Sequence, residues 1–159
     1  MSRRLLFLFL LALAATPVAA RDSLGVFGEW GAFKDAEVPR CYAIAAAQGD
    51  DAQGSASVGS WPRLQVRGQV HFRLSRSLRQ DAGASLLISG ERFALNGSGR
   101  NAFAPDRQAD ARIVAAMRAA GSMQVSGRDA QGRIFTDRYS LDGAATAMDA
   151  ASVGCARNS

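Results

Sequence analysis

Histidine and cysteine are scarce in this sequence, and the shortage excludes several kinds of site. His71 is the only histidine, and Cys41 and Cys155 are the only cysteines. A zinc site needs several His or Cys ligands at short spacings, and a thiol redox pair needs C-x-x-C proximity. A Ser-His-Asp triad would depend on His71, with no G-x-S-x-G motif to supply its serine. Asp50 and Asp51 are adjacent but lack the pattern of a calcium loop. We predict no catalytic residue, no metal site, no cofactor and no enzymatic activity.

Lysine is also nearly absent, since Lys34 is the only lysine and arginine supplies the remaining positive side chains. The formal net charge is +5, and a basic balance can indicate nucleic-acid binding. However, the arginines are scattered along the sequence and form no single basic stripe. We therefore expect no nucleic-acid partner.

Long apolar runs are missing after residue 20, so we expect no transmembrane segment in the mature chain. The first twenty residues, MSRRLLFLFLLALAATPVAA, carry two arginines, an apolar run and then small residues. This order is typical of a secretory signal peptide, and a retained interfacial anchor is the alternative. We predict cleavage after Ala20, which leaves residues 21–159 as one exported domain. No cysteine follows the cleavage point closely, so a lipid anchor is not indicated.

The two cysteines fit an exported protein, because disulfides persist in oxidising compartments. Cys41 and Cys155 lie near opposite ends of the mature chain. An even count favours a structural disulfide between them, and two free thiols remain the alternative. A bridge that closes so long a loop can stabilise the fold by up to about 4–5 kcal/mol.

Alternating apolar and polar residues predict a chain made mainly of strands. Val70, Phe72 and Leu74 alternate with polar residues, and 41–47 is an apolar run typical of a buried strand. A hairpin over 84–95 turns at its Ser-Gly pair. With roughly six strands spaced by turns, we predict an all-β fold, a single antiparallel β-sandwich with one or two short helices.

Two helices and one long loop complete the expected organisation. Asp106 can cap a helix over 107–120 that ends at Gly121, and a second, alanine-rich helix is expected over 142–151. The stretch 48–63 is rich in glycine, serine and aspartate, which predicts a loop. Trp61 near its end is expected to attach the loop to the body.

The stretch SMQVSGRDAQGRIFTDRYSL, residues 122–141, predicts a hairpin with a type I turn that begins at Asp129 and ends at Gly132. Asp137 falls on the apolar face of the returning strand. We expect it to form a structural ion pair or to lie at a sheet edge; the candidate partners are Arg128, Arg133 and Arg138. The alternative, acid–base chemistry, needs a second carboxylate.

The pieces SGERFALN, IVAAMRAAGSM and TDRYSLDGAATAMD, followed by Cys155, resemble the invasion-associated locus B (IalB) family of exported bacterial proteins. FGEWGAF followed by CYAIA is similar to that family's aromatic-then-cysteine opening. The resemblance covers residues 26–155 and implies an all-β envelope domain held by a disulfide. It places the protein in the periplasm or at the outer membrane of a Gram-negative bacterium. The family has no established catalytic site to carry over, and the stretch 48–62 departs from its pattern.

These observations favour a non-catalytic interaction module of the bacterial envelope. The partner is expected to be an envelope or extracellular protein, a glycan or a lipid. Trp61 and the stretch 48–60 are the predicted contact points, because binding residues concentrate on loops. The alternatives are an inhibitor of an exported enzyme, and a hydrolase of envelope polymers that would need convergent carboxylates in a cleft.

Overall fold

The computed structural model describes residues 21–49 and 53–156, so the predicted signal peptide, Asp50 and Asp51 lie outside the described residues. In the described part, ten strands form one antiparallel sheet in the order β1-β2-β3-β4-β5-β8-β7-β6-β9-β10. The strands are β1 Asp22–Phe27, β2 Trp30–Asp35, β3 Arg40–Ala46, β4 Ser55–Trp61, β5 Val66–Arg73, β6 Ala84–Ile88, β7 Glu91–Ser98, β8 Asn101–Phe103, β9 Ser122–Arg128 and β10 Ile134–Ser140. The predicted all-β class is confirmed.

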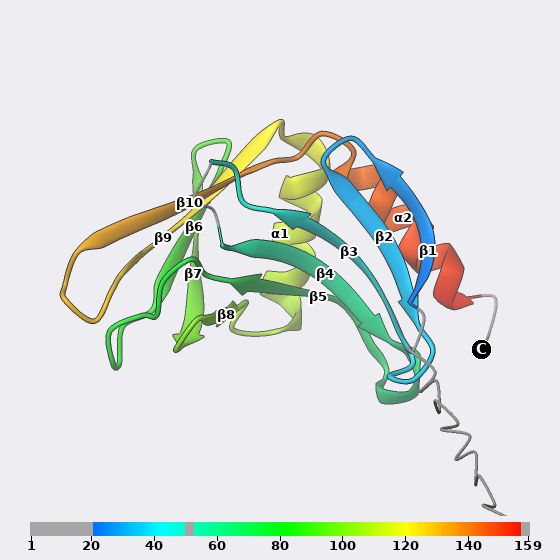
Figure 1. Ribbon diagram of the computed structural model, residues 1–159, viewed down its shortest axis with the longest axis horizontal. Helices are drawn as coiled ribbons and strands as arrows, with labels where there is room; N and C mark the ends of the chain where they lie inside the picture. The colour runs from blue at the N-terminus through cyan, green and yellow to red at the C-terminus, as the bar shows by residue number, and fades with distance from the viewer. Residues whose placement is uncertain (1–20, 50–52, 157–159) are drawn as a thin grey trace, which may run out of the picture.

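The sheet bends into two halves that share β7. The first part of β7 pairs with β6, from Ile88↔Glu91 to Ala84↔Leu95, and its last residues pair with β8. Strands that pass from one layer to another make the corners of β-sandwiches. The two halves pack together through the rings of Phe72 in β5 and Tyr139 in β10, whose centroids are 6.0 Å apart. The arrangement is therefore sandwich-like, with β1 and β10 as the end strands of the described sheet (Figure 1).

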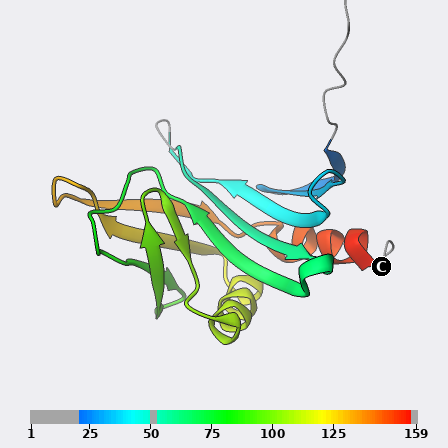
Figure 2. The same ribbon diagram turned by 90° about the horizontal axis from the view of Figure 1, so that it is seen from below.

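Two helices cover the β1–β5 half on its concave side, as Figure 2 shows. Helix α1, Arg107–Ala119, packs against β5, and helix α2, Ala144–Ala156, packs against β1, β2 and β3. The backbone N–H of Ala109 donates to Oδ1 of Asp106 at 2.8 Å, so the predicted N-cap of α1 is confirmed. Helix α2 starts two residues later than expected and extends further, so that it contains Cys155.

The predicted loop over 48–63 is wrong for its second half, because Ser55–Trp61 forms β4. This strand lies between β3 and β5, where Val58 is opposite both Ala43 and Val70. Its inward residues, Ala56 and Val58, are small, and serine and glycine occupy the positions between them. The composition of a loop therefore conceals the two-residue alternation of a strand. A deletion across 48–60 would remove the centre of the sheet.

The β1–β2 turn packs tightly against the start of α2. The backbone N–H of Glu29 donates to the carbonyl of Asp142 at 3.1 Å. Gly143 has a φ of +80°, and a Cβ atom at this position would overlap the carbonyl oxygen of Phe27. Glycine meets both requirements, the left-handed backbone and the close approach. This contact positions α2 on the sheet.

Candidate binding groove

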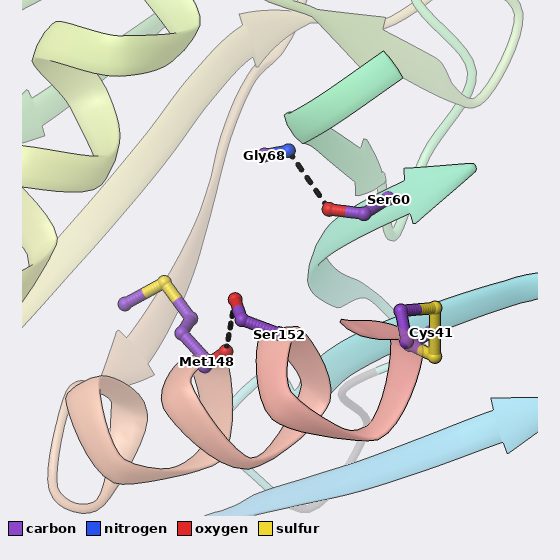
Figure 3. Close-up of a disulfide and its surroundings, with 6 residues drawn as sticks. Cys41, Ser60, Gly68, Met148 and Ser152 are labelled. Carbon is purple, nitrogen blue, oxygen red and sulfur yellow. Dashed lines mark hydrogen bonds between the residues drawn. A yellow bond between two sulfur atoms is a disulfide. The ribbon is translucent and has the colours of Figure 1, made fainter. Parts of the chain in front are cut away.

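A disulfide joins β3 to α2 and forms one end of a groove. The sulfur atoms of Cys41 and Cys155 are 2.06 Å apart and their Cα atoms 5.7 Å apart, which lies within the range of native disulfides. The predicted bridge is confirmed. Cys41 is buried on the inward face of β3, and Figure 3 shows the bond at the C-terminal end of α2.

The groove lies between α1, α2 and the β4–β5 connection, and its volume is about 1010 Å³. The connection includes a single 3-10 turn, Pro62–Leu64. Figure 3 shows Met148 and Ser152 on α2 facing the side on which Ser60 and Gly68 lie. The apolar lining consists of the disulfide, Val58, Pro62, Val66, Ala111, Val114, Met148, Ala151 and Ala156. A concave, mainly apolar site of this size is typical of a small-ligand pocket.

Helix α1 supplies one wall through a second stripe beside its buried one. The buried stripe consists of Asp110, Ile113 and Met117. The groove stripe, Arg107, Ala111, Val114 and Arg118, repeats at intervals of four, three and four residues, which keeps its members on one helical face. Val114 is half-buried, packs against the core and also lines the groove. In the sequence, the arginines at the two ends of this stripe were the signal that could have indicated a second, groove-lining face of α1.

Four arginines lie around the groove. Arg63 and Arg67 come from the β4–β5 connection, and Arg107 and Arg118 come from α1. Arg118 forms an ion pair with Asp149 at 2.7 Å. Within the described part of the chain, the other three take part in no salt bridge, and no aspartate or glutamate lines the groove. Arginines that are scattered in the sequence thus gather at one site, where their positive charge favours an anion.

The hydroxyl groups in the walls already have hydrogen-bond partners. Oγ of Ser152 donates to the carbonyl of Met148 at 2.9 Å, and Oγ of Ser60 accepts from the backbone N–H of Gly68 at 3.1 Å (Figure 3). Gln65 is the further uncharged polar side chain among the described lining residues. The groove therefore combines an apolar lining, hydroxyl groups that already take part in hydrogen bonds, and a cationic rim.

Asp110 is buried behind this groove, between α1 and β5. Its Oδ1 accepts the backbone N–H of Val70 at 2.8 Å. Strand β8 ends at Phe103, opposite His71, so it offers no carbonyl to the backbone N–H of Val70. The carboxylate of Asp110 accepts that hydrogen bond instead. Burial raises the pKa of Asp110; the hydrogen bond from Val70 lowers it, and the charge of Asp106 raises it further, so that the net shift is upward.

Asp137 lines a second, smaller cavity of about 500 Å³. Its Oδ2 accepts the backbone N–H of Ser75 at 2.9 Å. The predicted edge position of Asp137 is confirmed, because β10 is an end strand of the described sheet. The predicted ion pair is wrong, because no salt bridge of the described residues includes Asp137. Burial raises the pKa of Tyr139 above its usual range, and the charge of Asp137 raises it further. Among the described residues that line this cavity, Asp137 is the only carboxylate.

The ion pair forms instead at Asp129, in the turn of the same hairpin. The predicted turn is confirmed by the backbone N–H of Gly132, which donates to the carbonyl of Asp129 at 2.8 Å. Oδ2 of Asp129 accepts from Arg133 at 3.0 Å and from Arg76 at 3.1 Å. Burial acts to raise the pKa of Asp129, but the hydrogen bonds from Arg133 and Arg76 outweigh it and hold the pKa below its usual value. At this end of the hairpin, Asp129 therefore has a structural role.

Trp61 is half-buried at the end of β4, and its ring lies over Gly59. Residues 59 and 61 share the face of β4 opposite to that of Val58 and Ser60, which line the groove. The structure thus places the predicted contact residue outside the groove, and its role stays a prediction. His71 lies on the polar side of β5, hydrogen-bonded to Asn101 at 3.0 Å and stacked on Phe103.

The described residues form neither a cluster of metal ligands nor a membrane-spanning helix. Among residues 21–49 and 53–156, no three His, Cys, Asp or Glu side chains are grouped so that they could hold a metal ion. In the same part of the chain, no helix has the length and apolar character needed to cross a membrane.

The fold is similar to that of a solved bacterial protein. The crystal structure of invasion associated protein B from Bartonella henselae superposes with a TM-score of 0.61 and 15% sequence identity, over 81% of this chain and 95% of that one. The two chains share a fold. No protein-family model and no curated protein sequence matches this chain. The likeness in structure agrees with the resemblance seen in the sequence pieces.

Proposed function

We propose that the chain is an exported envelope protein of the invasion-associated locus B type, which binds a ligand or partner without catalysing a reaction. Its binding site is the groove between α1, α2 and the β4–β5 connection. The observation that carries this proposal is the apolar groove rimmed by Arg63, Arg67, Arg107 and Arg118, with no acidic lining residue in the described chain.

Three further observations support the proposal. The sequence pattern of residues 1–20, predicted to be a signal peptide, favours export, and the disulfide between Cys41 and Cys155 fits an oxidising compartment. The fold is similar to that of invasion associated protein B. The periplasm or the outer membrane of a Gram-negative bacterium is the proposed location.

The hydrolase alternative has less support in the described residues. It needs two carboxylates that converge in a cleft. The groove has none among its described lining residues, and the second cavity has Asp137 alone. Inhibition of an exported enzyme remains a second candidate; isolation of a stoichiometric complex with such an enzyme would favour it.

The proposal is tested by site-specific photocrosslinking in the bacterium that produces the protein. A photoreactive amino acid is placed at Ala111, which is exposed in the groove stripe of α1, and in a second variant at Trp61 on the opposite face of the sheet. Ala119 is the control, because it is exposed on α1 but does not line the groove. We expect adducts from Ala111, identified by mass spectrometry, and none from Ala119.

The other outcomes contradict the proposed site. Adducts from Trp61 alone would move the contact to the outer face of the sheet. Equal adducts from Ala111 and Ala119 would indicate non-specific proximity. An absence of adducts at every position would remove the support for a binding role.

A further inference from the structure

The chemistry of the groove defines its occupant more narrowly than the proposed function does. Val58, Val114 and Met148 line the groove beside the disulfide; Val58 and Met148 are buried members of the core, and Val114 is half-buried. Removal from water of the apolar surface that the groove lining still exposes is favourable, at about 25 cal/mol per Å². The apolar lining therefore favours an aliphatic or aromatic group over a sugar.

The walls favour an acyl chain over an extended peptide. A buried peptide needs partners for its own N–H and C=O groups, because an unpaired buried amide is costly. The backbones of Ala111, Val114 and Met148 lie inside α1 and α2, where they are hydrogen-bonded within the helices. The hydroxyl of Ser152 donates to a carbonyl of its own helix, and that of Ser60 accepts from a backbone N–H of β5. An acyl chain makes no demand for hydrogen bonds and fits such walls.

The rim favours an acidic head group. Arg63, Arg67 and Arg107 are exposed, they take part in no salt bridge of the described residues, and they surround an apolar space. A guanidinium group can bind a carboxylate through two parallel hydrogen bonds. The volume of about 1010 Å³ is at the upper end of the range for pockets that enclose one small ligand, which suits one chain.

We propose that the groove binds a free medium- or long-chain fatty acid, with its acyl chain on the apolar lining and its carboxylate against the rim arginines. This inference rests on the proposed function, because it names the occupant of the same groove. Arg67 and Arg107 face the head group from β5 and α1, on two sides of the site.

Direct binding is measured on the purified chain with 11-(dansylamino)undecanoic acid, whose fluorescence rises in an apolar environment. Competitors are decanoate, 1-decanol and butyrate, all below their aggregation limits. We expect decanoate to displace the probe at least about tenfold better than 1-decanol, because a charged hydrogen bond contributes roughly one factor of ten. We expect a preference over butyrate of at least the same size, because the short chain buries much less apolar surface. Decanol tests the head group, and butyrate tests the chain.

Two variants and their matched controls locate the site. Ala111→Trp fills the groove from an exposed helix position, and Ala119→Trp adds the same bulk outside it. Arg67→Ala with Arg107→Ala removes two rim charges, whereas Arg112→Ala removes an exposed α1 arginine that pairs with Glu91 instead. We expect Ala111→Trp to abolish probe binding and the double variant to weaken decanoate about tenfold but 1-decanol little. The controls should bind as the unsubstituted chain does, and thermal unfolding checks that each variant folds.

Several results would overturn the inference. These are no probe binding, equal displacement by decanoate and 1-decanol, equal displacement by butyrate, and unchanged binding in Ala111→Trp. Sedimentation with anionic phosphatidylglycerol vesicles without probe binding would assign the surface to membranes instead. Crosslinking of Ala111 to a protein would support the groove as a docking site but exclude the fatty acid as its occupant. The proposed function and this inference can therefore be contradicted independently.

Discussion

At the scale of single residues, Asp110 shows how a polar group becomes part of a core. The spacing from Asp110 to Ile113 and Met117 places all three on one helical stripe. The sequence predicts the helix but not the role of its aspartate, because nothing in α1 reveals that the backbone N–H of Val70 lacks a strand partner. That need arises only where β8 ends, opposite His71.

Asp110→Asn is expected to raise the melting temperature at pH 7. The folded chain holds the pKa of Asp110 above its ordinary value of 3.8, so the protonated form favours the folded state. The resulting stability is fully present below the unfolded pKa and is lost as the pH rises through the folded pKa. Asparagine keeps the acceptor for Val70 without a charge. Melting followed by circular dichroism from about pH 3 to pH 8 should show a smaller loss at high pH in the variant; a lower melting temperature at pH 7 would contradict this account.

Gly143→Ala is expected to destabilise the fold by about 2 kcal/mol or more, because it combines left-handed backbone strain with an overlap against the Phe27 carbonyl. Gly121→Ala is the matched control, since a Cβ atom there meets nothing within 4 Å; its effect should stay within about 0.5 kcal/mol. Urea unfolding of both variants provides the comparison. Equal stabilities would show that the β1–β2 turn moves away without cost.

At the scale of elements, strong local signals predicted α1 and the 122–141 hairpin. Asp106 caps the helix, and the Asp129-to-Gly132 turn closes the hairpin with the expected backbone hydrogen bond. Strand β4 escaped prediction because its inward residues are alanine and valine among serines and glycines. Its strand character comes from β3 and β5 on either side, which is tertiary information.

Removal of the disulfide between β3 and α2 should lower the stability of the fold, because the bond joins two elements that are far apart in sequence. Cys41→Ala with Cys155→Ala is expected to lower the free energy of unfolding by about 4–5 kcal/mol in the chain-entropy treatment, because the bond closes a loop with a sequence separation of 114. Chemical denaturation with and without a reductant measures the effect. The reductant should destabilise the native chain and leave the double variant unchanged, and equal stability of the two oxidised samples would contradict the prediction.

At the scale of the whole molecule, the fold class could be predicted but not the way in which it assembles. The alternation in 69–75 and 122–141 indicated an all-β chain, whereas the pairing of β5 with β8 and of β6 with β9 depends on segments far apart in sequence. The groove also depends on segments that are far apart in the sequence. Its arginines come from the β4–β5 connection and from α1, and its far wall comes from α2, so a scattered charge pattern becomes a site only after folding.

The disulfide also sets an order of events in the life of the molecule. In the folded chain, Cys155 meets Cys41 where α2 docks on β1–β3, and α2 follows every described strand in the sequence. The bond therefore forms after α2 has docked. A chain in which α2 has not docked keeps two thiols and lacks one wall of the groove. Disulfide formation thus coincides with the closing of the groove wall that α2 supplies.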